Sequence, residues 1–143
     1  MVKNGATLYP NRDGEDVVDG AGGVYNPNNL YMDGPAIFKF TTVAVPKLVD
    51  ATLAKNNLTL DDIDYTIFHQ ANNLILETLR KKVGIPIEKY YIDVKDTGNT
   101  VSSTIPIAIK ESIKSGKLSG NVLLTGFGVG YSWGGCIIKI DKQ

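Results

Sequence analysis

The sequence predicts an α/β fold: a mixed, mostly parallel five-stranded sheet with helices on both faces. Segments with the apolar spacing of a helix alternate with short apolar segments of strand length, which indicates crossover connections and a largely parallel sheet. The last two strand-like segments are separated only by a glycine-rich turn, so we expect them to pair antiparallel. A chain of 143 residues, 43% of them hydrophobic, is long enough for one domain with a buried core.

The first 33 residues are expected to contain little regular structure beyond a short strand at residues 6–8. Residues 9–33 include Pro10, Pro27 and many glycine, asparagine and aspartate residues, which favour turns. Long irregular segments of this kind are uncommon inside compact domains. They usually form a functional surface or become ordered by contact with another part.

A long helix is predicted from Gly34 to a stop at Asn56 and Asn57, because apolar residues recur along it at helical spacing. Pro46 lies inside this helix. A proline there lacks the backbone donor and clashes with the preceding turn, so we expect a kink or a local break.

The remaining elements alternate between strands and helices. A strand at Tyr65–Phe68 leads into a helix at residues 72–83, which Gly84 and Pro86 terminate. The elements expected after it are a strand at residues 90–94, a helix at 102–115 capped by Ser102 or Ser103 with Pro106 in its first turn, and two strands at 122–125 and 136–140.

Charge and cysteine content argue against several classes of function. Fifteen basic and fifteen acidic residues cancel, so no overall field attracts nucleic acid or anionic lipid. Cys136 has no second cysteine to pair with, and one cysteine with one histidine cannot complete a closed zinc site. The N-terminus has no apolar signal region, and no segment is apolar for long enough to span a bilayer. We expect a cytoplasmic protein without a metal, a nucleic-acid partner or a membrane segment.

Two polar side chains, His69 and Asn99, each lie between a predicted strand and the element after it. Ligand and catalytic groups gather beyond the carboxyl ends of strands in open α/β sheets, so the two could converge. An imidazole and an amide directed at one point would stabilise a developing oxyanion. The alternatives are a histidine that caps the next helix and an ordinary Gly-Asn turn.

The glycine-rich segment Gly126-Phe127-Gly128-Val129-Gly130 does not match a dinucleotide-binding loop. The pattern G-x-G-x-x-G would require a glycine where Tyr131 stands, and a strand follows instead of a helix. The glycines serve either a tight turn or close approach to a substrate. Cys136, in the run Cys136-Ile137-Ile138, is expected to be a buried, inert core residue.

Three motifs taken together resemble the C-terminal part of the beta-ketoacyl-acyl-carrier-protein synthase III family. They occur in the family's order: Phe68-His69-Gln70-Ala71-Asn72, then Gly98-Asn99-Thr100, then the segment from Gly126 to Gly134. The resemblance covers nearly the whole chain and implies the second half of a thiolase-like fold. One departure is Val129, which stands where the family has a glycine and leaves the acyl preference open.

The resemblance also implies an activity. A cysteine of the first half, absent from this chain, would accept an acyl group from acyl-coenzyme A. Malonyl-carrier-protein would then lose carbon dioxide and condense with it in fatty acid biosynthesis. His69 and Asn99 would stabilise the enolate, while Phe127, Gly128, Val129 and Asn72 would contact the substrate. No cofactor other than these substrates is implied.

Residues 1–143 would then be the C-terminal catalytic domain, with the acyl carrier protein, acyl-coenzyme A and the missing N-terminal half as partners. We expect the isolated chain to be inactive and to self-associate through the apolar surface that the missing half would cover. Two alternatives stay open. The chain could be a non-enzymatic module that binds an acyl chain or a carrier protein, or part of a thiolase-superfamily condensing enzyme of secondary metabolism.

Overall fold

The centre of the molecule is a mixed three-stranded sheet in the order β6-β7-β8. β6 (Tyr65–Phe68) runs parallel to β7 (Gly120–Gly128), and β7 pairs antiparallel with β8 (Ser132–Ile140). The predicted antiparallel pairing of the last two strands is therefore confirmed. The structure is a computed structural model that describes residues 3–4, 7–8, 14–20, 22–26 and 31–141.

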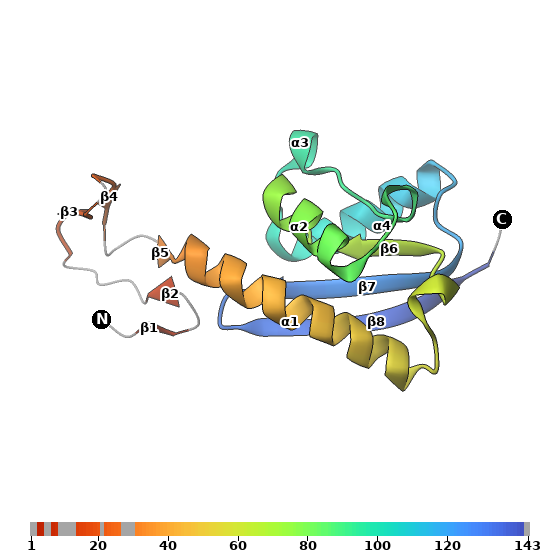
Figure 1. The fold of residues 1–143 in the computed structure, drawn as a ribbon. Helices are drawn as coiled ribbons and strands as arrows, with labels where there is room; N and C mark the ends of the chain where they lie inside the picture. Colours follow the sequence, from red (N-terminus) through yellow and green to blue (C-terminus); the bar gives the residue numbers. More distant parts are fainter. Residues whose placement is uncertain (1–2, 5–6, 9–13, 21, 27–30, 142–143) are drawn as a thin grey trace.

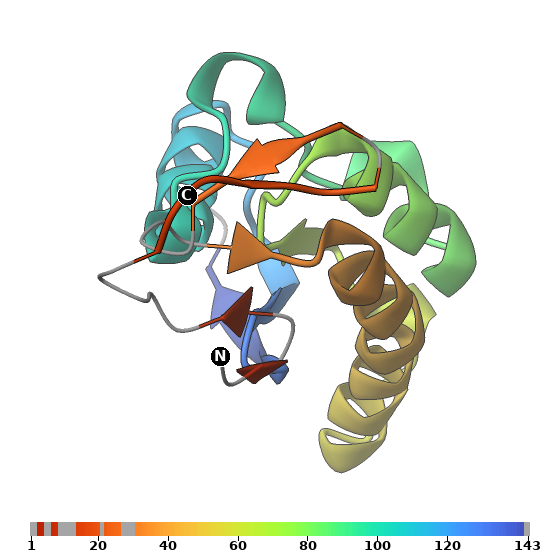
Figure 2. The same ribbon diagram turned by 90° about the vertical axis from the view of Figure 1, so that its left-hand side faces the viewer.

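Helices cover both faces of this sheet, as the sequence predicts (Figures 1 and 2). Helices α1 (Gly34–Lys55) and α2 (Asn73–Val83) lie on one face, and α4 (Thr104–Lys114) lies on the other. Side chains alternate along β7 because successive residues of a strand point to opposite faces. Leu123 accordingly packs with α1 and α2, whereas Val122 packs with α4.

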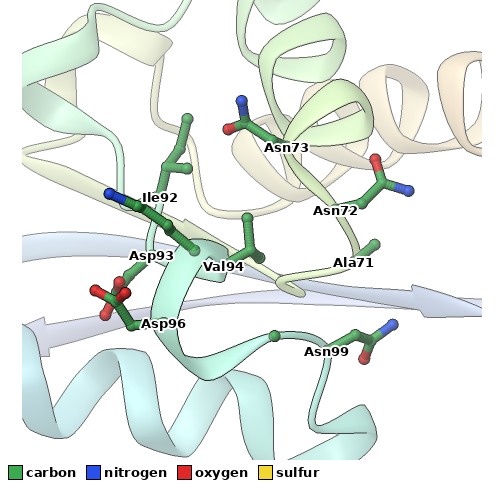
Figure 3. Close-up of a pocket in the computed structure, with 10 residues that line it drawn as sticks. Ala71, Asn72, Asn73, Ile92, Asp93, Val94, Asp96 and Asn99 are labelled. Atoms are coloured by element: carbon green, nitrogen blue, oxygen red, sulfur yellow. The ribbon is translucent and has the colours of Figure 1, made fainter.

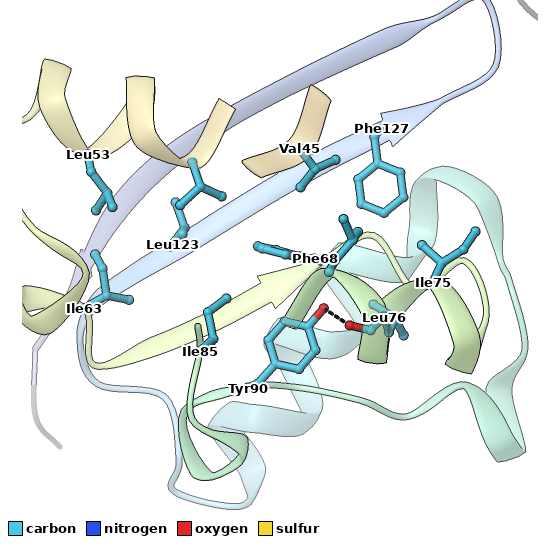
Figure 4. Close-up of a cluster of buried hydrophobic side chains, with 12 residues drawn as sticks. Val45, Leu53, Ile63, Phe68, Ile75, Leu76, Ile85, Tyr90, Leu123 and Phe127 are labelled. Atoms are coloured by element: carbon cyan, nitrogen blue, oxygen red, sulfur yellow. Dashed lines mark hydrogen bonds between the residues drawn. The ribbon is translucent and has the colours of Figure 1, made fainter. Parts of the chain in front are cut away.

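The larger hydrophobic core lies between the sheet and the pair α1 and α2 (Figure 4). The hydroxyl group of Tyr90 is buried there and donates a hydrogen bond to the carbonyl oxygen of Leu76, at 3.3 Å. The buried residues of this core are Val45, Val49, Leu53, Ile63, Phe68, Ile75, Leu76, Leu79, Ile85, Tyr90, Leu123 and Phe127.

The sheet is narrower than the five strands predicted from the sequence. Residues 90–94 do not form a strand: Tyr90 makes one parallel bridge to Thr66, and α3 (Val94–Thr97) follows as a single helical turn. The buried side chain of Gln70 forms hydrogen bonds with backbone groups of Tyr91 and Asp93 that a strand partner would otherwise bind. The N–H of Tyr91 donates to the carbonyl oxygen of Thr66 in β6 at 3.0 Å, but the next bond of the segment goes to the loop after β6: Gln70 Oε1 accepts from the N–H of Asp93 at 3.0 Å.

The predicted strand at residues 6–8 corresponds to β2, which belongs to a separate small sheet with the order β1-β2-β5. Its residue 6 lies outside the described part of the chain. Within residues 9–33, the described stretches contain a two-stranded hairpin whose turn is held by the Asp19 Oδ1, which accepts from the N–H of Gly23 at 2.8 Å. Residues 9–13, 21 and 27–30 also lie outside the described part. The short strands are β1 (Lys3–Asn4), β2 (Thr7–Leu8), β3 (Val17–Val18), β4 (Val24–Tyr25) and β5 (Tyr31–Met32).

Helix α1 continues without interruption through Pro46, so the predicted local break is wrong. The proline removes one helical hydrogen bond. Val45 and Val49 flank it with no exposed surface, and their packing against the sheet holds the helix together across this position.

The other helices begin and end close to where the sequence predicts. α2 follows Asn72, whose side-chain Oδ1 accepts from the N–H of Ile75 at 2.9 Å, and ends at Gly84 in the left-handed conformation. Before α4, neither predicted serine cap makes its bond; Ser103 occupies the cap position without a side-chain hydrogen bond. The short 3-10 helices are η1 (Leu60–Asp62), η2 (Ile87–Lys89) and η3 (Val101–Ser103).

Among the described residues, no helix is both long enough and apolar enough to cross a membrane.

Candidate active site

His69 lies directly after β6, at the carboxyl end of the strand. Its backbone N–H donates to the carbonyl oxygen of Thr125 at 2.8 Å, which extends the parallel pairing with β7 by one residue. The same pairing brings Phe127 beside it, with the two ring centroids 5.4 Å apart and the planes at 79°. Two of the residues predicted for the site are therefore in contact.

The imidazole of His69 is half-buried, and burial lowers its pKa below the ordinary value because the charged form loses water. The ring is therefore neutral at pH 7. A neutral imidazole has one N–H and one bare nitrogen, so its partners decide whether it donates or accepts toward the site.

Thr104, the first residue of α4, is the hydrogen-bond partner of this ring. Its Oγ1 lies 2.7 Å from Nδ1 of His69 and 3.0 Å from the carbonyl oxygen of Val101. The N–H of Val101 in turn donates to Oδ1 of Asn99 at 2.9 Å. A short chain of contacts thus joins the two predicted catalytic side chains through Val101 and Thr104.

Asn99 is exposed, and its side-chain oxygen is engaged by Val101. Val101 has a positive φ of 56°, which is unfavourable for a β-branched residue. The bonds to its N–H and its carbonyl group hold it in that conformation. Within the described residues, the Nδ2 amide group of Asn99 has no hydrogen-bond partner, so it is available as a donor.

A cavity of about 780 Å³ adjoins Asn99 and the start of α2 (Figure 3). Asn72 also lines it; because Asn72 Oδ1 caps α2, its amide nitrogen is the group left to contact a ligand. His69 and Phe127 do not belong to the lining. The lining residues are Ala71, Asn72, Asn73, Ile92, Asp93, Val94, Lys95, Asp96, Gly98 and Asn99.

Gly128 and Val129 lie where β7 turns into β8. Gly128 is the last residue of β7 and pairs with Ser132, and the side chain of Val129 is 39% exposed in the turn. The connection is only three residues long, shorter than the turn predicted from Gly126 to Gly135. It begins one residue after Gly128 ends β7, which runs parallel to β6, so its backbone N–H groups lie at the same end of the sheet as His69.

Cys136 is exposed on β8, so the predicted burial is wrong. β8 is an outer strand of the sheet among the described residues, so one of its edges is uncovered. Cys136 pairs with Leu124, and Leu124 pairs with Ile67 of β6, two residues before His69. Two strand spacings and two residue rises separate Cys136 from His69 by about 12 Å between Cα atoms. The thiol is therefore too distant to act with the imidazole in this arrangement.

Sequence reasoning missed two residues of the site, Thr104 and Gln70. Gln70 is 2% exposed; its Nε2 donates to the carbonyl oxygens of Phe68 and Tyr91 at 2.8 and 3.3 Å and so fixes the loop that carries His69. The available signal for Gln70 was its place beside the only histidine. Thr104 had a weaker signal, its position in the first turn of the helix after Asn99. Within the described ranges, no three His, Cys, Asp or Glu residues cluster as metal ligands would.

A family model, curated relatives and solved structures all relate this chain to the same family. Residues 53–140 match the family described as 3-Oxoacyl-[acyl-carrier-protein (ACP)] synthase III C terminal. A curated relative, the beta-ketoacyl-[acyl-carrier-protein] synthase III of Lactococcus lactis subsp. lactis strain IL1403, is 44% identical over 120 residues, which are 81% of this chain and 37% of the relative. The chain therefore spans little more than a third of the length of that relative.

Two solved structures show the same fold. A 3-oxoacyl-(acyl-carrier-protein) synthase III superposes with a TM-score of 0.83 at 39% identity, covering 87% of this chain and 37% of that one. The priming beta-ketosynthase of the R1128 polyketide biosynthetic pathway superposes with a TM-score of 0.74 at 31% identity, covering 80% and 35%. The thiolase-like fold inferred from the motifs is confirmed, and the chain belongs to the family of 3-oxoacyl-[acyl-carrier-protein] synthase III C-terminal domains.

Proposed function

We propose that this chain is the C-terminal half of a 3-oxoacyl-[acyl-carrier-protein] synthase III and supplies two donors, His69 and Asn99, to a decarboxylative condensation. The observation that carries the proposal is the chain of contacts from His69 through Thr104 and Val101 to Asn99. It leaves Nε2 of the imidazole and Nδ2 of the amide as the free polar groups of the pair among the described residues.

The reaction requires donors of this kind. When a malonyl thioester decarboxylates, the bond to the carboxylate breaks, carbon dioxide leaves, and the electron pair passes to the thioester oxygen as an enolate. Preorganised N–H groups directed at that oxygen stabilise the new charge most effectively where water is excluded. The enolate carbon then attacks an acyl-cysteine thioester, a carbon–carbon bond forms, and the cysteine thiolate leaves.

The nucleophilic cysteine of this scheme comes from the missing N-terminal half. Cys136 lies too far from His69 for that role. We therefore propose that the isolated chain does not condense acyl thioesters, and that acyl-coenzyme A and malonyl-carrier-protein bind only when both halves are present. Cys136 is the only cysteine of this chain, so no disulfide can form within it, which fits the cytoplasmic location that we propose.

Carbon dioxide release from malonyl-carrier-protein tests the proposal, with acyl-coenzyme A as primer. The chain is compared alone and mixed with the missing half, supplied as a separate polypeptide from the same source. Activity in the mixture only, lost by about 100-fold or more with His69→Ala, supports the proposal. An active isolated chain, or a mixture in which His69→Ala changes nothing, contradicts it.

The distance of the one thiol from His69 also favours a second candidate, a non-enzymatic module that binds an acyl chain or a carrier protein. Such a module would bind acyl thioesters equally well after His69→Ala and Asn99→Ala. The likeness to a priming beta-ketosynthase favours a variant of the first proposal, a condensing enzyme of secondary metabolism. Comparing acyl primers in the reconstituted mixture would separate that variant from fatty acid synthesis.

The homo-oligomer expected from the sequence also remains a proposal, for the chain as well as for the complete protein. Light scattering of the chain during size exclusion, at tens of micromolar, measures it directly, and a monomer under those conditions contradicts it.

A further inference from the structure

Thr104 stands in an unusual position for a threonine at the start of a helix. Its side chain is buried, with 3% of its surface exposed, and its hydroxyl oxygen faces a residue from another element, His69 at the end of β6. Within the described residues it is the ring's hydrogen-bond partner. The contact spans two elements, so it fixes the ring relative to α4 as well as to the sheet.

The hydroxyl group has one proton, and two groups lie within its reach: the carbonyl oxygen of Val101, which accepts, and Nδ1 of His69, which accepts or donates according to the tautomer. Nδ1 of His69 lies 2.7 Å from Oγ1, and the carbonyl oxygen of Val101 lies 3.0 Å from it. The Val101 carbonyl also accepts from the backbone N–H of Thr104, so it keeps a donor whichever way the hydroxyl turns. An unprotonated Nδ1 has no other donor among the described residues. The shorter distance also matches an O–H donor better than an N–H donor.

We infer that Thr104 is a positioning residue for His69: its hydroxyl group donates to Nδ1 and thereby holds the remaining ring proton on Nε2. A bare Nδ1 that accepts a hydrogen bond excludes the other neutral tautomer. The lowered pKa of His69 agrees, because burial keeps the ring neutral and leaves the tautomer as the property to be set.

The consequence for catalysis depends on the proposed function. With the proton on Nε2, a neutral ring can donate to an enolate oxygen without first acquiring a charge. With the proton on Nδ1, the lone pair of Nε2 would face the oxyanion and repel it. Thr104 would thus determine whether His69 acts as a donor while touching no substrate itself.

The protein is well suited to a direct test, because His69 is its only histidine. Labelling histidine with ¹⁵N gives one pair of ring nitrogen resonances, whose positions report which nitrogen carries the proton. The comparison uses the wild-type chain, Thr104→Val, which removes the hydroxyl at nearly constant shape, and Thr104→Ser, which keeps it. Thr78→Val is the matched control, since Thr78 Oγ1 donates only to the Leu74 carbonyl group within α2.

We expect protonated Nε2 in the wild-type chain, with the Nδ1 resonance displaced by an accepted hydrogen bond. That displacement should disappear in Thr104→Val and persist in Thr104→Ser and Thr78→Val. A wild-type proton on Nδ1 overturns the inference even if every variant fails to fold. A Nδ1 resonance unchanged in a folded Thr104→Val chain overturns it as well.

Activity provides the second measurement, in the mixture with the missing half. Thr104→Val should lower kcat for decarboxylation by up to about 100-fold while KM changes little, and Thr104→Ser should restore it. Equal losses in the two variants would contradict a role for the hydroxyl. An inactive wild-type mixture would count against the proposed function alone, since the nitrogen resonances still decide the role of Thr104.

Discussion

The ring of Phe127 meets the ring of His69 edge to face, with centroids 5.4 Å apart. Phe127 is 8% exposed and belongs to the larger core, whereas His69 is half-buried at the rim of that core. One aromatic side chain therefore connects the hydrophobic interior to the candidate active site.

Phe127→Leu should separate these two roles. Leucine retains most of the buried apolar volume but loses the aromatic pair, so we expect a loss of about 1 kcal/mol in the free energy of unfolding. Phe127→Ala also leaves a cavity and should cost about 3–5 kcal/mol. Urea denaturation measures both, and equal losses for the two variants would contradict this assignment.

The stability of the chain should fall in mildly acidic solution because of His69. Burial lowers its pKa in the folded state, so the unfolded chain binds more protons as the pH falls below about 6.5. Stability is therefore fully present above that pH and is lost as the pH drops through the lowered folded-state value. Urea denaturation between pH 7.5 and 5 should show a steeper decline for the wild-type chain than for His69→Gln; parallel curves would refute the prediction.

Asn99→Asp and Asn99→Ala should differ in stability but not in activity. The aspartate still accepts from the N–H of Val101, whereas alanine leaves that group without its partner and should cost about 1 kcal/mol. Both variants lack the amide donor, so both should slow decarboxylation in the reconstituted mixture by at least about 100-fold. Retained activity in Asn99→Asp would show that the amide is not a donor in the reaction.

Val101→Gly should stabilise the chain, even though valine is the larger apolar residue. Val101 is 73% exposed, so little buried surface is lost, and glycine adopts its φ of 56° without steric cost. We expect a gain of about 1 kcal/mol over Val101→Ala, which keeps a Cβ in the same conformation. Thermal unfolding of the two variants tests this, and identical transition temperatures would contradict it.

The sequence predicts most of the secondary structure because apolar spacing and terminators act locally. Asn72 and Gly84 bound α2 for reasons visible in a few neighbouring residues. The failures have non-local causes. Residues 90–94 have the composition of a strand, but Gln70 takes up the N–H of Asp93. The burial of Cys136 depends on what covers β8, and no pattern in its own segment reports that.

For the candidate site, the sequence identifies the reactive side chains but does not predict how they are oriented. His69 and Asn99 can be selected by residue type and by their place after predicted strands. The residues that orient them cannot, since the contact between Thr104 and His69 depends on how α4 packs on the sheet. The positive φ of Val101 is similarly imposed by bonds from both sides of it.

The parallel pairing of β6 with β7 also sets the order in which the site can assemble. The hairpin of β7 and β8 is local, and such hairpins form within about 1–10 μs. The hydrogen bond from His69 to Thr125, in contrast, is non-local. It forms only when the loop that contains α2, α3 and α4 has closed and brought β6 and β7 together. During synthesis the ribosome adds His69 long before its strand partner, so the imidazole stays outside any organised site until β7 has emerged.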